Sequence, residues 1–223
     1  MFEKFNIKKG DIITVTGAGG KTSLIYLLSE ELSKKGKVLI TTTTKIYIPP
    51  KEKFESLEII EERIKIFGDN KNIFVIGKSI LGNKIIGVDY QEVERLKEKF
   101  DYILVEGDGA KEKILKDWNE TEPCIFPSST KVIGVINLNI LDLKINEENI
   151  HRFEIFKRNY SEYLEKKLDL NFLIKFILKG KFFHNSLNSE KYIFFNEVNT
   201  VERKEIVEKI RDRLAKENIK IVY

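Results

Sequence analysis

A glycine-rich turn near the N-terminus has the residue types that bind a phosphate chain. It reads Gly17-Ala18-Gly19-Gly20-Lys21-Thr22-Ser23. Glycines let backbone N–H groups approach phosphate oxygens closely, and a helix that follows adds its positive end. We expect Lys21 to contact the terminal phosphates and the Thr22 hydroxyl to coordinate Mg²⁺. The match departs from the pattern G-x-x-x-x-G-K-[ST], because Val15 stands at the first glycine. A plain glycine turn that only joins a strand to a helix is the alternative.

A second candidate is the acidic turn Glu106-Gly107-Asp108-Gly109, which follows the apolar run 102–105. A carboxylate at the end of a buried strand is suited to hold Mg²⁺, directly or through water, and we assign this role to Glu106. Asp108 is a candidate for orienting the attacking water or another substrate. The flexible backbone at Gly109 is suited to bond a γ-phosphate. The alternative is a tight acidic turn that caps the next element.

Two further polar segments follow predicted strands. The run Thr41–Thr44 suggests a ligand crevice, although threonines are also ordinary strand residues. The segment Asn196–Asn199 lies where GTPases read guanine, but an amide at Asn199 lacks the second acceptor oxygen of a carboxylate. An ordinary turn, with Asn199 or Thr200 capping the last helix, is an equal alternative. The sequence therefore does not decide between ATP and GTP.

Four other residues have weaker signals. Cys124 is the only cysteine, which excludes an internal disulfide and a zinc site with several thiolates from this chain. Its apolar neighbours predict a buried, unreactive thiol. Arg152, next to His151, is either a charge-stabilising finger or a solvated helix residue, and Lys45 either meets a phosphate or faces water.

The elements that must position these residues alternate between strand and helix. A β-branched run at 12–16, helical spacing over 24–32 and a second run at 38–42 predict a βαβ unit with parallel strands. Further strands are predicted at 73–76 and 84–88, forming a hairpin or meander, and at 102–105, 132–136, 192–195 and 219–222. Helices are predicted at 90–100, 150–168, 170–178 and 201–215. We therefore predict an α/β fold, a three-layer P-loop NTPase-like domain with a mostly parallel central sheet. It forms a single domain over 1–223, with a less regular insertion at about 46–88.

Charge and hydropathy limit the classes of partner that we expect. The chain has 39 Lys and Arg against 35 Asp and Glu, interspersed along its length. Neighbouring carboxylates cancel the field that nucleic-acid binding requires, so no nucleic-acid partner is expected. We find no apolar stretch of signal-peptide or membrane-spanning length, and we expect a cytoplasmic protein without a membrane partner.

Five segments, taken in order, resemble the successive signatures of the YqeC family: Val15–Ser23, Thr41–Thr44, Val105–Ala110, Glu122-Pro123 and His151-Arg152. The resemblance spans most of the chain. It implies a nucleotide-dependent accessory protein for selenium-dependent molybdenum hydroxylases, which acts in maturing or delivering the molybdenum cofactor.

The leading hypothesis is a nucleoside triphosphatase that uses ATP or GTP with Mg²⁺ to drive assembly or insertion of a selenium- or sulfur-containing molybdenum cofactor. Its partner would then be a molybdenum hydroxylase or another enzyme of that cofactor. Catalysis would be electrostatic and would rest on Lys21, Glu106 and Asp108. An ATP-dependent small-molecule kinase or ligase is one alternative, because the loop also resembles the phosphate loop of Mur ligases. A nucleotide switch that does not hydrolyse is another.

Overall fold

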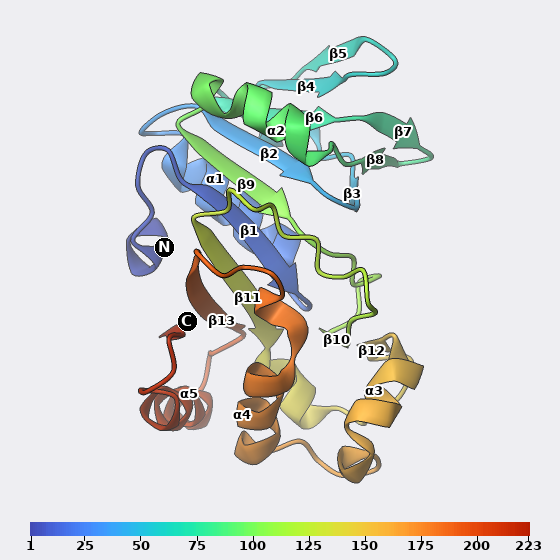
Figure 1. Cartoon of the computed structure of the whole chain (residues 1–223), viewed down its shortest axis with the longest axis vertical. Helices are drawn as coiled ribbons and strands as arrows, with labels where there is room; N and C mark the ends of the chain where they lie inside the picture. The colour runs from blue at the N-terminus through green and yellow to red at the C-terminus, as the bar shows by residue number, and fades with distance from the viewer.

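A nine-stranded sheet runs through the molecule, and eight of its strands are mutually parallel (Figure 1). The computed structural model describes residues 1–223. Along the sheet the strands are β14 (Lys220–Val222), β13 (Glu190–Asn196), β11 (Lys131–Asn137), β1 (Ile12–Gly17), β9 (Tyr102–Glu106), β2 (Val38–Thr42), β6 (Ile73–Gly77), β4 (Ser56–Ile59) and the antiparallel edge strand β5 (Ile64–Phe67).

Helices cover both faces of this sheet, because successive strand residues point to opposite sides and both sets are apolar. Ile13 and Val15 of β1 pack with α1 (Lys21–Leu32) in one core cluster. Ile12 belongs to a separate cluster with α2 (Tyr90–Leu96). The remaining helices α3 (Phe153–Asn159), α4 (Leu170–Lys179) and α5 (Val201–Arg213) pack in a third cluster, which includes Ile193 of β13. The three-layer α/β fold with a mostly parallel sheet is therefore confirmed.

Two small sheets stand beside the carboxyl ends of the central strands (Figure 1). One is antiparallel and consists of β3 (Lys45–Tyr47), β8 (Lys84–Ile86) and β7 (Ser79–Leu81). The other pairs β10 (Leu115–Lys116) with β12 (Ile150–His151) in parallel. Six short 3₁₀ turns complete the chain at Phe2–Phe5, Lys51–Lys53, Lys97–Lys99, Leu138–Asp142, Ser161–Tyr163 and Lys181–Phe183.

Two predictions about secondary structure were wrong, and several strands were not predicted. The strands near 73–76 and 84–88 do not pair with each other, because β6 joins the central sheet and β8 pairs with β3 and β7. The insertion expected at about 46–88 contains strands that the sequence did not predict, among them the largely buried β4 and the exposed edge strand β5. The helix predicted at 150–168 covers only Phe153–Asn159. It begins late because β12 precedes it and Arg152 has a left-handed φ of 60°, and only the short 3₁₀ turn Ser161–Tyr163 follows it.

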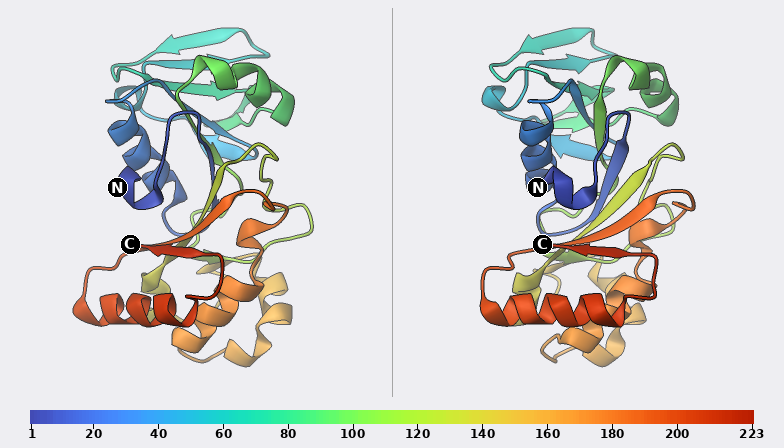
Figure 2. Two further views of the ribbon diagram at one scale, coloured as in Figure 1. Left: turned by 60° about the vertical axis from the view of Figure 1, so that its left-hand side comes forward. Right: turned by 90° about the vertical axis from the view of Figure 1, so that its left-hand side faces the viewer.

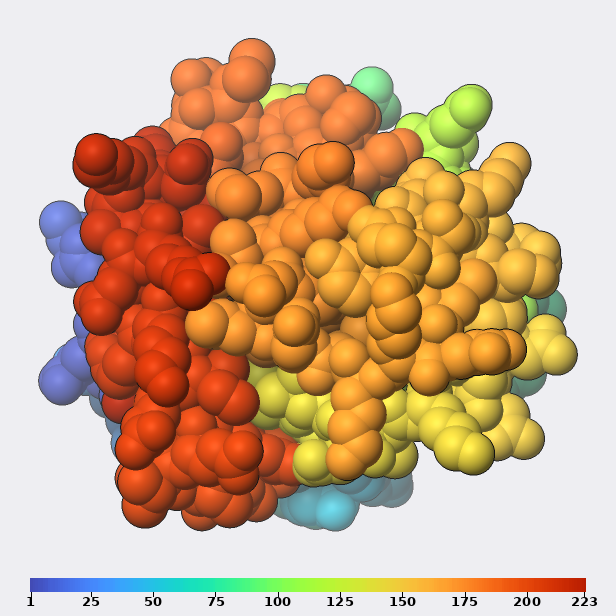
Figure 3. Space-filling model, turned by 90° about the horizontal axis from the view of Figure 1, so that it is seen from below, coloured from blue at the N-terminus to red at the C-terminus, as the bar shows by residue number.

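Helix starts follow the sequence closely. Asp89 accepts a hydrogen bond from the Glu92 N–H at 3.0 Å and so caps the start of α2. Thr200 accepts from the Arg203 N–H at 3.2 Å and caps α5. From below, α5 lies beside α4 and the segment around α3 (Figure 3). The two chain ends lie close together (Figure 2), and Lys4 Nζ donates to the Tyr223 carbonyl oxygen. No helix combines the length and apolarity needed to cross a membrane.

Candidate functional site

The glycine turn between β1 and α1 has a conformation that depends on its glycines. Gly17, Gly19 and Gly20 have φ values of 94°, 74° and 141°, which residues with a Cβ rarely adopt. A Cβ on Gly19 would lie 2.4 Å from the Asn137 Cβ, and one on Gly20 would lie 2.5 Å from the Asn196 Nδ2. We call residues 17–23 the phosphate loop, after the role that the sequence predicts for them.

Two asparagines from neighbouring strand ends hold the phosphate loop. Asn137 ends β11 and Asn196 ends β13, and each Nδ2 donates to the Gly19 carbonyl oxygen at 3.0 Å. The sequence suggested a base-reading segment at Asn196–Asn199, whereas the Asn196 amide contacts the loop instead. Asn199 is exposed, and its amide lies near Glu197 and Arg203. Sequence reasoning missed Asn137, whose only signal was a polar residue at the carboxyl end of a buried strand.

Lys21 opens α1 and is almost completely buried, with 5% of its surface exposed. Its Nζ donates to the Gly17 carbonyl oxygen at 2.7 Å, which closes the phosphate loop on itself. The same Nζ lies 3.2 Å from Asp108 Oδ1 and 4.0 Å from Glu106 Oε1. The ammonium group therefore joins the phosphate loop to the acidic turn.

Thr22 and Glu106, the two expected metal ligands, are in direct contact. The Thr22 hydroxyl donates to Glu106 Oε2 at 2.8 Å. Burial raises the pKa of the Glu106 carboxyl, against the opposing effects of the Lys21 charge and the Thr22 hydrogen bond. A hydroxyl and a carboxylate are the oxygen donors that Mg²⁺ takes beside phosphates and water, so this pair fits that ion.

Asp108 has no exposed surface, in contrast to its expected contact with water. Its Oδ2 accepts from the Gly17 N–H at 3.1 Å and from the Trp118 indole N–H at 2.6 Å. Lys21 and Lys116 lie 3.2 Å from its two oxygens. Asp108 is therefore a positioning residue, which holds the Gly17 N–H and the Lys21 ammonium in place through buried contacts.

A buried lysine extends this network away from the phosphate loop. Lys116 Nζ donates to the Gly109 carbonyl oxygen at 2.7 Å and to Glu122 Oε2 at 3.1 Å. Arg152 binds both oxygens of Glu122, at 2.8 and 2.9 Å. Burial alone would raise the pKa of Glu122, but Arg152 and Lys116 together hold it below its ordinary value. Sequence reasoning found Arg152 and missed Lys116 and Trp118. Lys116 ends the two-residue strand β10 and Trp118 follows it, and so short a strand has no recognisable sequence pattern.

His151 lies beside this network. It pairs with Lys116 across the β10–β12 sheet. Burial and the neighbouring Lys116 and Arg152 charges lower the pKa of His151 to about 4. The imidazole is therefore neutral at neutral pH.

These residues surround one open cleft of about 1050 Å³ at the carboxyl ends of the strands. Its floor is formed by residues 19–23 of the phosphate loop with Glu106, Asn137 and Asn196. The walls contain Thr43, Thr44, Lys45, Ile46, Tyr47 and Lys84 on one side, and Gly109, Ala110, Lys111, Glu112, Lys113, Glu122, His151 and Arg152 on the other. Gly17, Ala18 and Asp108 do not line the cleft.

The run Thr41–Thr44 combines the two roles that the sequence left open, which are strand residues and the lining of a ligand crevice. Thr43 and Thr44 line the cleft. Thr41 is buried and donates to the Ile76 carbonyl oxygen at 2.8 Å, and Thr42 donates to the Glu106 carbonyl oxygen at 2.9 Å. The first two threonines thus tie strands together, and the last two face the site.

The prediction of a buried thiol was wrong, because Cys124 is exposed. Its N–H donates to the Gly107 carbonyl oxygen at 2.9 Å, and its own carbonyl accepts from the Thr43 hydroxyl at 3.2 Å. These backbone bonds, together with the buried Ile125 and Phe126, turn the Cys124 side chain outward.

Comparison with known proteins identifies the family of this chain. The model of the YqeC protein family matches residues 13–154. The "Uncharacterized protein YqeC" of Escherichia coli (strain K12) is 36% identical over 155 residues, which are 67% of this chain and 60% of that protein. The chain thus spans less than two thirds of the length of this relative. No solved structure matches. The chain belongs to the YqeC family.

Proposed function

We propose that this protein binds a nucleoside triphosphate with Mg²⁺ on the phosphate loop and hydrolyses it. The observation that carries the proposal is the Thr22–Glu106 hydrogen bond of 2.8 Å at the floor of the cleft. It brings a hydroxyl from the start of α1 to a carboxylate from the end of β9. Thr22 and Glu106 would together hold a Mg²⁺ ion beside the bound phosphates.

The phosphate loop supplies the anion site. Side-chain-free backbone at Gly19 and Gly20 leaves N–H groups free to approach phosphate oxygens, and α1 adds its positive end. Lys21 supplies a positive charge, which Asp108 at 3.2 Å partly compensates. The Gly17 carbonyl that it now contacts is a neutral partner, which a phosphate oxygen can replace.

Catalysis on this site is electrostatic. Lys21 stabilises charge that develops on the transferred phosphoryl group, and Glu106 holds the metal or its water. Asp108 keeps the loop amides and Lys21 in place from beneath. A bound Mg²⁺ would neutralise charge on the phosphate oxygens.

The biological partner that we propose is a molybdenum hydroxylase, or another enzyme of the molybdenum cofactor. This part rests on the family resemblance. Hydrolysis would drive maturation or insertion of a selenium- or sulfur-containing form of that cofactor.

The first test is calorimetric titration with non-hydrolysable ATP and GTP analogues plus Mg²⁺. We expect wild type to bind one or both, and Lys21→Ala to lose at least about tenfold in affinity. Lys71→Ala is the matched control, because Lys71 is exposed and lies outside the cleft. Absence of binding to wild type would refute the nucleotide site.

A second experiment separates hydrolysis from the alternatives. Phosphate release is measured with and without a molybdenum hydroxylase, for wild type and Glu106→Gln. A variant that binds nucleotide but does not release phosphate supports hydrolysis. Transfer of phosphate to an added small molecule would identify a kinase or ligase, and binding without turnover in either condition would identify a switch.

A further inference from the structure

The cleft continues beyond the phosphate loop onto a small platform on the β3–β8 pair. Lys45 and Tyr47 alternate with the buried Ile46, so both side chains are on the exposed face of β3. Lys84 is the cross-strand partner of Tyr47, and its Nζ lies 4.2 Å from the Tyr47 ring centroid. We call these three residues the β3–β8 platform.

The positive charges of the platform are not neutralised. Neither Lys45 nor Lys84 has a carboxylate within ion-pair distance. In contrast, Lys21 and Lys116 lie against the buried Asp108, and Arg152 is paired with Glu122. Lysines in a concave wall without acidic partners attract an anion that is still to be bound.

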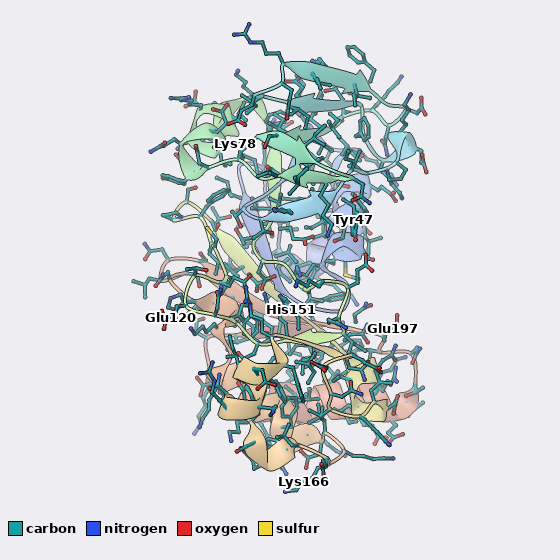
Figure 4. All side chains as sticks on the ribbon, turned by 90° about the vertical axis from the view of Figure 1, so that its right-hand side faces the viewer. Tyr47, Lys78, Glu120, His151, Lys166 and Glu197 are labelled. Atoms are coloured by element: carbon teal, nitrogen blue, oxygen red, sulfur yellow. The ribbon has the colours of Figure 1, made fainter.

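The opposite wall is also basic. Lys111 has no carboxylate partner and lies in a loop where Lys111 and Glu112 both have left-handed φ, at 48° and 61°. Lys113 donates to the Glu148 carbonyl oxygen, and no carboxylate neutralises its charge. Both lysines, with His151 and Arg152, also line an adjoining hollow of about 360 Å³. Figure 4 looks onto this side of the molecule and shows Tyr47 and His151 on the two walls.

The size and charge of the cleft leave room for a second ligand. At about 1050 Å³ it reaches the upper end of the range of roughly 300–1000 Å³ that single small-molecule sites occupy. Its lining has five lysines and one arginine against three glutamates. Lys21 would bind a triphosphate on the phosphate loop. Lys45 and Lys84 would then remain available to bind a second anion.

We propose that the β3–β8 platform is a second binding site, for a phosphorylated small molecule with a planar ring. The ring stacks on Tyr47, which is 44% exposed, and the phosphate lies between Lys45 and Lys84. This inference deepens the proposed function, on which its role as second substrate rests. The bound molecule would lie in the same cleft as the triphosphate and beside Thr43 and Thr44.

Flavin mononucleotide is a suitable probe, because it combines a flat ring with a phosphate and its fluorescence falls on stacking. It is titrated into wild type saturated with the nucleotide analogue and Mg²⁺. We expect saturable binding, with riboflavin at least about tenfold weaker because it lacks the phosphate. Inorganic phosphate should compete.

Variants locate the probe. Tyr47→Ala and the double variant Lys45→Gln/Lys84→Gln should each lose about tenfold in affinity for flavin mononucleotide. Lys71→Gln is the control for the loss of a surface charge. A probe that binds none of the proteins saturably, or that binds the platform variants as well as wild type, overturns the second site.

The outcome also separates this proposal from the proposed function. If the nucleotide analogue displaces the probe and Lys21→Ala abolishes binding of both, the probe occupied the phosphate loop and the platform site is refuted. If the probe binds Lys21→Ala normally and is lost only with the platform variants, the second site stands. It would stand even if wild type bound neither ATP nor GTP analogue.

Discussion

The Asp108 carboxylate accepts a hydrogen bond from the Gly17 N–H at 3.1 Å. This bond joins the acidic turn after β9 directly to the start of the phosphate loop, across 91 positions of sequence. Asp108 also lies between two buried lysines, Lys21 and Lys116. The phosphate loop is therefore held by a charged network as well as by its glycines.

Asp108→Asn is expected to destabilise the fold. The amide keeps the shape of the side chain but leaves Lys21 and Lys116 with less compensating charge in a buried site, which costs roughly 3 kcal/mol of unfolding free energy. Urea unfolding measures the loss. Asp69→Asn, at an exposed position, should stay within about 0.5 kcal/mol of wild type. Wild-type stability with lost turnover would instead indicate that Asp108 acts on water.

Gly19→Ala is expected to distort the phosphate loop. The new methyl group would overlap the Asn137 Cβ and the Ile114 carbonyl oxygen, at 2.4 and 2.8 Å. Gly82 has a similar left-handed φ of 62°, but no atom lies within 4 Å of the place that a Cβ would take there, so Gly82→Ala reports backbone strain alone. We expect Gly19→Ala to unfold at least about 1–3 kcal/mol more easily than Gly82→Ala and to bind the nucleotide analogue at least about tenfold more weakly. Equal free energies of unfolding for the two variants would show that the neighbouring atoms move to make room for the new methyl group.

Trp118 is the only tryptophan and is buried beside the acidic turn. Its emission should therefore be that of an apolar environment and should shift to longer wavelength in urea. Trp118→Phe removes the indole N–H that Asp108 accepts, and we expect a loss of about 1–3 kcal/mol, measured by circular dichroism in urea. Tyr160→Phe is the control, because it removes a hydroxyl of the same aromatic cluster that makes no hydrogen bond. If Trp118→Phe lost no more unfolding free energy than Tyr160→Phe, the indole hydrogen bond would not stabilise the fold.

His151 should titrate far below an ordinary histidine. The chain has two histidines, so the proton resonance that disappears in His151→Gln identifies it. We expect a midpoint at about 4 in place of the ordinary 6.5. Since the folded state then binds the proton less readily than the unfolded state, the protein loses stability as pH falls from 6.5 to 4. His151→Gln should lose less over that interval, and a midpoint near 6.5 would contradict the packing of His151 against Lys116.

The sequence by itself determined the central architecture and the floor of the site. Apolar runs such as Ile12–Thr16 and Tyr102–Val105 are buried on both faces, and only a parallel sheet between helices accommodates them. The strand–glycine–lysine order placed Lys21 at the start of α1, and Glu106 ended β9 as expected. Local pattern suffices for these features, because periodicity and turn chemistry act between near neighbours.

Only the tertiary structure decided what surrounds that floor. Asn137 contacts Gly19, which lies 118 positions away in the sequence. Lys116 and Trp118 contact Asp108 from a segment without helical or strand periodicity, so no local spacing encodes these contacts. The same cause turned Cys124 outward and buried Asp108. Burial and charge pairing depend on which segments meet in space. For this reason the sequence placed Asp108 in contact with water, whereas the structure buries it against the phosphate loop.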